Sequence, residues 1–421
     1  MQHDAGLTWL HISDIHFQPK KDWRDIPARR SLLTFLRKQF ADQKLPVPDL
    51  IFCTGDIAFG ESAKATMTQQ YGYANDFFTE LLQICGSLPK DRLFVVPGNH
   101  DVNRTKVNED AQAALGDKAK ESRIHEEAIN QRFEGAGLEH QQALQRLGDY
   151  GLFIQERLPH QSNPERHVYA KVIDIRGTKI GVGGFNSAWS CAGPEDDRHL
   201  WLAAQWQFNH VQQLLEPAQL RIGLIHHPVD WLNEAERDVS TRRIAGNFHF
   251  WLHGHMHNAW VSPGPNCTTV AAGAVGADTP DEFGINLVSL DFAKNSGKVH
   301  LLGYSARDDG WTSKPVAHHA PDGVWPLSIP TLPEFIASPE ISCAKLPETA
   351  PALESNDLDA LTPLVHALPS TRPQKLYGRE KLIVELLEQS KSKNVLVLYG
   401  LRGNGKTELI NALLQQPKFV G

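Results

Sequence analysis

The stretch Leu93-Phe94-Val95-Val96-Pro97-Gly98-Asn99-His100-Asp101 joins an apolar run of strand length to a polar segment that ends in metal-binding side chains. The same arrangement recurs along the chain. The other polar segments are Asp14-Ile-His16 after residues 7–12, Gly55-Asp56 after 50–54, His226-His227-Pro228 after 222–225, and Gly254-His255-Met256-His257 after 248–252. Side chains at neighbouring strand ends converge in space even when they are far apart in sequence. These residues are therefore expected to form one site.

The side chains of this site are aspartate, histidine and asparagine, with no thiolate. Such donors suit Mn²⁺, Fe or Zn²⁺ in a catalytic centre better than a structural zinc site. Two divalent ions about 3.5–4 Å apart need a bridging carboxylate, and together they hold a phosphoryl group and lower the pKa of bound water. A single Asp-x-His would be an ordinary loop segment. The ordered set, each member after its own strand, predicts a binuclear metal centre.

These segments resemble those of the calcineurin-like metallophosphoesterase superfamily, whose pattern is D-x-H, G-D, G-N-H-D or G-N-H-E, H, and G-H-x-H. The resemblance implies the following metal ligands: Asp14, His16 and His257 for one ion, Asn99, His226 and His255 for the other, and Asp56 as the bridge. Within the pair His226-His227, the match to the family's H-H-P segment favours His226 as the ligand.

The same resemblance gives roles to two neighbours of Asn99. His100 is similar to the family's general acid or transition-state stabiliser, with Asp101 as the carboxylate that orients it. The protein phosphatase branch resembles G-D-x-x-D-R-G at the second segment, whereas Asp56 is followed here by Ile-Ala-Phe-Gly-Glu. The resemblance therefore argues against a protein serine/threonine phosphatase.

The resemblance covers roughly residues 7–310 and implies an α/β fold, a four-layer α/β/β/α sandwich. The local patterns agree with this fold. Apolar residues have helical spacing in 28–43 and 73–84, and residues 284–292 and 298–304 form a predicted hairpin. We therefore expect a metallophosphoesterase domain over residues 1–312.

Residues 103–158 are a largely polar, helical stretch, where a compact core would need only a short connection. Because the stretch leaves the segment that carries Asn99 and His100, it is expected to begin beside the metals. One interpretation is a lid or substrate-selecting cap. The other is a solvated helical hairpin or a subunit contact.

A second motif lies near the other end of the chain. An apolar run at 394–399 is followed by Gly400-Leu-Arg-Gly-Asn-Gly405-Lys406-Thr407 and a helical pattern at 408–414. This is G-x-x-x-x-G-K-T in its strand-to-helix context, so the loop with Gly400, Gly403 and Gly405 should cradle phosphates. Lys406 would reach the β/γ oxygens and Thr407 would hold Mg²⁺. Residues 376–387 resemble the helix that introduces the nucleotide-binding domain of STAND-type NTPases.

The chain is thus expected to contain three parts. The metallophosphoesterase domain (1–312) is followed by a Pro-rich linker (313–373) and by the first βα unit of a truncated P-loop NTPase domain (374–421). In the full-length protein this region is expected to bind ATP and Mg²⁺ and to mediate self-association.

The composition excludes several classes of protein. The 421 residues are 41% hydrophobic and 22% charged, as in ordinary globular proteins, and the net charge of −7 gives no global basic field for nucleic acid. The five cysteines are scattered, which argues against a disulfide framework or a thiolate metal site. No apolar run reaches the ~18–20 residues of a membrane span, and the first strand leaves no room for a signal peptide. These features predict a cytoplasmic protein without a membrane partner.

Three functions remain after these exclusions. The favoured one is a metal-dependent phosphodiester hydrolase, a nuclease or nucleotide phosphodiesterase, which serves as the effector of a STAND-type sensor. Such fusions resemble bacterial antiphage systems. The alternatives are a stand-alone cyclic-nucleotide phosphodiesterase or phosphomonoesterase, and a non-enzymatic scaffold, against which the complete ligand set argues. Manganese is the expected metal, with Fe, Zn or Ni as alternatives.

Overall fold

The computed structural model describes residues 6–17, 22–113, 115, 123–135, 137–193, 198–276, 279 and 282–329. The chain divides into two units, Met1–Phe335 and Ile336–Gly421, and the described residues all belong to the first. The predicted P-loop (Gly400, Gly403, Gly405, Lys406 and Thr407) and the linker beyond residue 329 therefore lie outside the described residues.

The first sheet has seven strands in the order β12-β11-β10-β1-β2-β3, with β13 paired to β11. Its strands are β1 (Gly6–Ile12), β2 (Leu50–Cys53), β3 (Leu93–Val95), β10 (Gly284–Asp291), β11 (Ser296–Ser305), β12 (Gly310–Ser313) and β13 (Val324–Ser328). Strands β1, β2 and β3 are parallel to one another. Strands β10 and β11 pair in antiparallel fashion, which confirms the predicted hairpin.

The second sheet has six strands in the order β4-β5-β6-β7-β9-β8. Its strands are β4 (Tyr169–Ile175), β5 (Thr178–Gly184), β6 (Leu220–Leu224), β7 (Phe250–His253), β8 (Trp260–Pro263) and β9 (Thr268–Ala271). The four strands β5, β6, β7 and β9 run parallel. Both sheets therefore gather several carboxyl strand ends, where functional residues of α/β folds usually lie.

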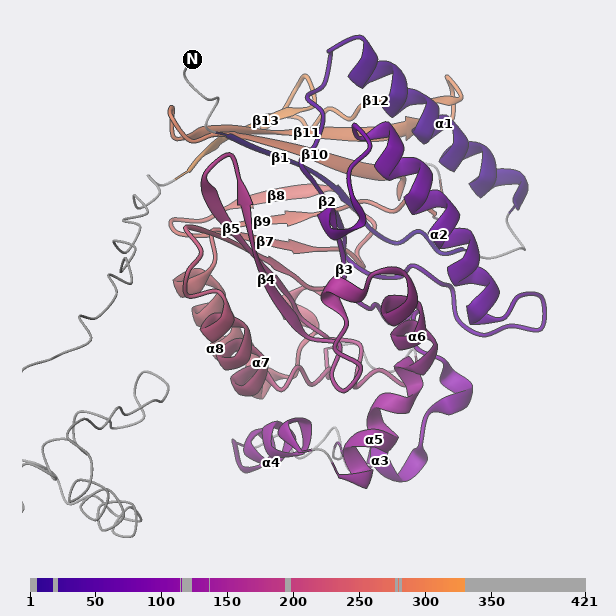
Figure 1. Cartoon of the computed structure of the whole chain (residues 1–421), viewed down its shortest axis with the longest axis vertical. Coiled ribbons are helices and arrows are strands. Elements are labelled where there is room, and N and C mark those ends of the chain that lie inside the picture. Colours follow the sequence, from indigo (N-terminus) through magenta and orange to yellow (C-terminus); the bar gives the residue numbers. More distant parts are fainter. Residues whose placement is uncertain are drawn as a thin grey trace, which may run out of the picture. The chain divides into compact units, whose positions relative to one another are not determined.

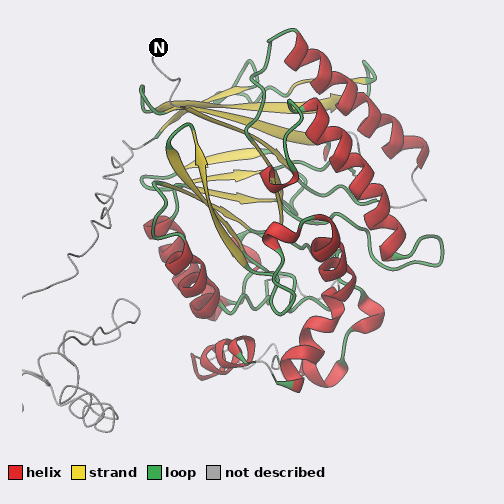
Figure 2. Ribbon diagram, viewed as in Figure 1, coloured by secondary structure: helices red, strands yellow, loops and turns green. Residues whose placement is uncertain are grey.

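Helices cover the outer face of each sheet (Figures 1 and 2). The first sheet carries α1 (Asp22–Ala41) and α2 (Met67–Ile84), and the second carries α7 (Ala204–Leu214) and α8 (Glu234–Asn247). Helix α2 begins after Thr66 because the Thr66 side chain accepts the backbone N–H of Gln69 in a capping box.

The buried side chains form two apolar clusters, as the alternation of residues along a strand requires. Trp9 and Phe52 of the first sheet pack with Phe250 of the second, whereas Leu10 and Ile51 point to the helices. The layers are therefore helix, sheet, sheet and helix, which confirms the predicted four-layer sandwich.

The insertion between β3 and β4 is helical, as the sequence predicts. It contains α3 (Glu109–Ala113), α4 (Arg123–Glu134), α5 (Leu138–Leu144) and α6 (Gly148–Arg157). Helix α6 packs against α2, where the Phe153 and Tyr71 rings stack with centroids 4.8 Å apart. One helix of the insertion is therefore part of the core.

The end of the described chain differs from the expected linker. Residues of β13 pair with β11, and the side chains of Trp325 and Leu327 are buried. The chain thus stays within the first sheet beyond residue 313, where the linker was expected to start. Among the described residues, no helix combines the length and the apolar composition that a membrane crossing needs.

Candidate metal centre

The polar segments predicted from the sequence come together at the carboxyl ends of β1, β2, β3, β6 and β7. Backbone bonds join the first two of them: the N–H of Asp14 donates to Gly55 O at 3.0 Å, and that of Ile15 donates to Asp56 O at 2.9 Å. The loops after β1 and β2 therefore hold each other in place before any side chain is considered.

Most of the candidate ligands have an unusual backbone. Positive φ angles occur at Asp14 (51°), His16 (51°), Asp56 (51°), His255 (68°) and His257 (51°). Only small or locally hydrogen-bonded residues visit this left-handed region at low cost. The tight turns after the strands direct these side chains toward a common centre, and this strain has no signal in the sequence.

Asp14, His16 and His257 form one cluster, with ligand atoms within 4.8 Å of one another. His257 Nε2 lies 3.2 Å from Asp14 Oδ1. The other nitrogen of each imidazole is already occupied: His16 Nδ1 lies 2.8 Å from Gly276 O, and His257 Nδ1 lies 2.9 Å from Glu282 Oε2. Outer contacts of this kind fix the ring orientation of metal-binding histidines.

A second cluster surrounds the side-chain oxygen of Asn99. His226 Nε2 lies 3.0 Å from Asn99 Oδ1, His227 Nε2 lies 3.2 Å from it, and His255 Nδ1 lies 3.1 Å from it. The structure thus places His227 beside the predicted ligands Asn99, His226 and His255. His227 Nδ1 lies 2.8 Å from Ser187 Oγ.

Asp56 lies between the two clusters. Its Oδ2 is 3.2 Å from His16 Nε2 and 3.3 Å from His226 Nε2. Its Oδ1 accepts the backbone N–H of His100 at 2.7 Å. One carboxylate oxygen therefore faces both groups of ligands, the position that a bridging ligand would need.

The nitrogen and oxygen atoms of the candidate ligands are arranged to bind a cation and not to hydrogen-bond to one another. His226 Nδ1 lies 2.7 Å from Thr54 O, which can only accept, so Nδ1 carries the proton in this assignment. In the neutral ring the lone pair of His226 Nε2 then points at the oxygens of Asn99 and Asp56. His16 is in the same situation, because its Nδ1 faces Gly276 O. Lone pairs that face lone pairs at hydrogen-bond distance require a proton or a metal ion between them.

The ionisation of these groups reflects the same conflict. Burial disfavours a charged His226 ring, yet the carboxylates of Asp56 and Asp14 overcome it and raise the His226 pKa to about 9. Burial likewise opposes charge on His257, but Asp14 and Glu282 raise its pKa to about 9. A protonated imidazole thus supplies the positive charge that a metal ion would supply. The Oδ1 atom of Asp14 is buried and faces His257 Nε2 at 3.2 Å.

His100 lies at the rim of this centre. Its ring stacks on Phe59 with centroids 4.7 Å apart, lies 4.8 Å from the His16 ring, and places Nδ1 3.3 Å from Phe59 O. Burial lowers the pKa of His100. The side chain is partly exposed, so a substrate oxygen can reach it.

Asp101, predicted as the carboxylate that orients His100, accepts hydrogen bonds from other groups. The Asp101 carboxylate accepts the backbone N–H groups of Gly98, Ile57 and Ala58 at 2.9, 3.2 and 3.0 Å, and the Tyr71 hydroxyl at 2.9 Å. It is fully buried, which raises its pKa to about 6. The carboxylate turns inward because four donors converge on it there, so it anchors the loops of Asp56 and Asn99 to each other.

Sequence reasoning missed several residues around the centre. Glu282 and Ser187 contact ring nitrogens of His257 and His227, and the Trp231 ring lies 4.0 Å from the His255 ring in an edge-on arrangement. Phe59 belongs to the segment after Asp56, whereas Glu282 and Ser187 have no motif around them.

With this geometry established, the comparison with protein families is decisive. Residues 7–259 match the model of the calcineurin-like phosphoesterases. The chain belongs to this family. It is therefore a metal-dependent phosphoesterase, and the family implies divalent metal ions at the centre described above. Residues 376–421 match the model named Novel STAND NTPase 6, so the hydrolase shares its chain with a STAND NTPase region.

The solved structures that the chain matches have low sequence identity and low TM-scores. GAP50, the anchor in the inner membrane complex of Plasmodium, is 11% identical, with 71% of this chain and 84% of that chain covered and a TM-score of 0.37. Phosphopantetheinyl hydrolase from Mycobacterium tuberculosis is 14% identical, with 65% and 92% covered and a TM-score of 0.34. Vacuolar protein sorting 29 from Cryptosporidium parvum is 13% identical, with 77% and 98% covered and a TM-score of 0.31. A search of curated proteins finds no match.

Proposed function

We propose that this phosphoesterase hydrolyses phosphodiester bonds of nucleic acids or nucleotides at a binuclear centre. Asp14, His16 and His257 would hold one ion, Asn99, His226 and His255 the other, and Asp56 both. The observation that carries this proposal is the position of Asp56 Oδ2, 3.2 and 3.3 Å from a nitrogen of each cluster. Manganese is the metal we expect, because the donors are nitrogen and oxygen atoms only.

The chain's own residues supply the rest of the chemistry. Bound divalent ions would provide the positive charge and the activated water that phosphoryl transfer needs. His100, at the rim, would donate a proton to the leaving oxygen or stabilise the charge that develops on it. Asp101 holds the loop of His100 in place by accepting the backbone N–H of Gly98 and the hydroxyl of Tyr71.

Two aromatic rings favour a substrate that carries bases. Phe59 is 37% exposed and lies beside His100, and Trp231 lies beside His255 on the side of the second cluster. Aromatic side chains stack on nucleobases of any sequence, with a gain of about 1–3 kcal/mol per base. A phosphomonoesterase of small substrates has no need of such platforms at both sides of the centre.

The regulatory part of the proposal rests on the STAND NTPase region in the same chain. We infer that nucleotide binding at Gly400, Gly403, Gly405, Lys406 and Thr407, with Mg²⁺, biases self-association of the full-length protein and thereby activates the hydrolase. The hydrolase would then be the effector of a sensor, as in bacterial antiphage systems. The antiphage role is inferred by analogy with systems that fuse an effector to a sensor in the same way.

The test is a substrate panel with Mn²⁺: linear DNA, plasmid, RNA, cyclic nucleotides and bis-nitrophenyl phosphate. We expect cleavage of nucleic acid or nucleotide diesters, about two metal ions per chain, and loss of both activity and metal in Asp56→Asn. Activity on cyclic nucleotides with no cleavage of DNA or RNA would support a stand-alone signalling enzyme instead. Full activity in Asp56→Asn, or a wild type that binds no Mn²⁺, would refute the binuclear centre.

A further inference from the structure

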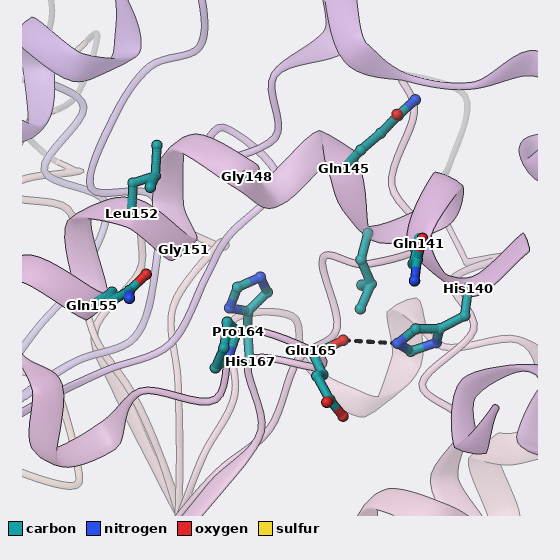
Figure 3. Close-up of a pocket in the computed structure, with 11 residues that line it drawn as sticks. His140, Gln141, Gln145, Gly148, Gly151, Leu152, Gln155, Pro164, Glu165 and His167 are labelled. Atoms are coloured by element: carbon teal, nitrogen blue, oxygen red, sulfur yellow. Dashed lines mark hydrogen bonds between the residues drawn. The ribbon is translucent and has the colours of Figure 1, made fainter. Parts of the chain in front are cut away.

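The helical insertion contains a cavity that shares none of the candidate metal ligands. It has a volume of about 410 Å³ and lies between α5, α6 and the segment that precedes β4 (Figure 3). We call it the cap pocket, and its lining includes His140, Gln145, Gly148, Gly151 and His167. Its volume lies within the range of small-molecule sites, roughly 300–1,000 Å³.

His167 is the residue that points to a ligand. Its side chain is 6% exposed and lines the cap pocket. Its ring meets the Tyr150 ring edge-on at 5.4 Å, but neither ring nitrogen has a hydrogen-bond partner among the described residues. The nitrogens are not among the fully buried unpaired atoms, so they are accessible from the cap pocket that the side chain lines. A ligand in the cap pocket would find a hydrogen-bonding group there.

The backbone holds His167 in this position at a cost. Its φ angle is 53°, in the left-handed region that a histidine rarely adopts. A local network maintains the turn: the N–H of His167 donates to Asn163 O at 2.7 Å, and Asn163 Nδ2 donates to Val168 O at 2.8 Å. The orientation of the ring is therefore built into the segment.

The opposite wall is flat. Gly148 and Gly151 lie one helical turn apart on α6, so this strip of helix carries no side chains. A Cβ atom added at Gly148 would meet nothing within 4 Å, whereas one at Gly151 would lie 2.8 Å from the His167 ring. The space beside Gly148 is therefore open, whereas the His167 ring covers Gly151.

The lining offers hydrogen bonds but no free charge among the described residues. Burial lowers the pKa of His167 to about 4, so its ring is neutral at physiological pH and presents one donor and one acceptor. The glutamine amides of Gln145 and Gln155 also line the cap pocket. The one carboxylate, Glu165, pairs with Arg166 at 2.6 Å. The lining therefore favours an uncharged ligand.

We propose that the cap pocket binds an uncharged planar heterocycle with hydrogen-bonding edges, such as the base of a nucleoside. The ring would lie over Gly148, where the helix surface is open, with its edge on one nitrogen of His167. Tyr150 and Phe153, on the buried side of α6, pack against Tyr71, whose hydroxyl donates to Asp101 at 2.9 Å. Helix α6 thus connects the cap pocket to Tyr71 and, through it, to the loop that carries His100. A ligand in the cap pocket would act as an effector through these contacts.

The test uses adenosine, guanosine, cytidine and uridine, each titrated separately into the whole 421-residue chain by calorimetry. We expect saturable binding of at least one of them. Gly148→Leu should weaken it at least about tenfold, because the new side chain fills the pocket without a clash. The matched control is Gly72→Leu in α2, another helical glycine with nothing within 4 Å of an added Cβ. It should bind as the wild type does.

Two further variants make the outcome unambiguous. His167→Asn, which keeps the left-handed backbone but has a shorter side chain, should also lose binding, with thermal unfolding and metal content as checks of the fold. Asp56→Asn should bind nucleoside normally, so failure of the metal centre and failure of the cap pocket are distinguishable. The proposal is overturned if none of the four nucleosides binds at millimolar concentration, or if Gly148→Leu binds them as well as Gly72→Leu does.

Discussion

At the residue scale, three ring nitrogens converge on one amide oxygen, that of Asn99. An amide oxygen accepts hydrogen bonds, yet three imidazole nitrogens approach it within 3.0, 3.1 and 3.2 Å. Protons on some of these rings can satisfy the oxygen, but each such proton removes a metal ligand. Metal binding and protonation of these histidines therefore compete. Binding of a metal ion should release protons.

The two adjacent histidines should differ when they are replaced. His226 Nε2 reaches both Asn99 and Asp56, whereas His227 Nε2 reaches Asn99 and its other nitrogen is engaged by Ser187. We expect His226→Ala to lower the bound Mn²⁺ by about one ion per chain and to abolish hydrolysis. His227→Ala should keep more metal and more activity. Elemental analysis of both proteins decides, and the reverse order would assign the ligand role to His227.

His100 should matter for chemistry and not for metal binding. In His100→Ala the contact to Asp56 survives, because the backbone N–H makes it. We expect kcat to fall by ~10²–10⁴ with the metal content unchanged. The loss should be smaller for a nitrophenyl ester, whose leaving group needs little protonation. The ring nitrogens also lie within 4.8 Å of ligand atoms of His16 and Asp56, so a variant that loses metal would make His100 a ligand.

At the scale of elements, one carboxylate ties two catalytic loops to a helix. Asp101 accepts from the loop after β2, from its own loop after β3, and from Tyr71 of α2. A buried carboxylate with four donors is satisfied, and removal of one donor leaves part of its charge unpaired. The loops of Asp56 and Asn99 thus depend on an aromatic residue that touches neither metal cluster.

Tyr71→Phe removes this support alone, since the phenyl ring keeps its stacking on Phe153. We expect a loss of about 1.5–3 kcal/mol in the free energy of unfolding, as for a hydrogen bond to a charged group, together with a lower kcat. The control is Tyr150→Phe, a buried tyrosine whose hydroxyl bonds to Val95 O at 3.4 Å instead. Denaturant unfolding and steady-state kinetics on both variants make the comparison. Equal effects would mean that Asp101 has no special role.

The sequence predicts those elements whose signal is local. The apolar runs before Asp14, Asp56 and Asn99 became strands because each is short, buried and followed by a turn. Strand β13 escaped prediction because Pro326 interrupts it, and proline is tolerated there only because β13 pairs with a single neighbour. The contact of His16 with Gly276 spans 260 residues, so no local pattern could indicate it.

At the scale of the whole molecule, the candidate centre lies within one unit of the chain. Its ligands span residues 14 to 257, inside the unit Met1–Phe335. We expect a protein cut after residue 335 to keep its metal content and its hydrolysis of bis-nitrophenyl phosphate, and Lys406→Ala to leave the rate of the 421-residue chain unchanged. Elemental analysis measures the metal content, and kinetics with and without ATP measure the two rates of hydrolysis. If the cut protein lost its metal, the centre would depend on residues beyond the unit Met1–Phe335.

The left-handed backbone of five candidate ligands has an evolutionary consequence. At roughly 1–2 kcal/mol for each such residue, the strain is comparable to the whole net stability of many domains, roughly 5–15 kcal/mol. Glycine at these positions would relieve it and destroy the centre. Laboratory evolution toward heat resistance alone should therefore favour glycine at these positions, and only continued selection for hydrolysis can retain Asp14, His16, Asp56, His255 and His257.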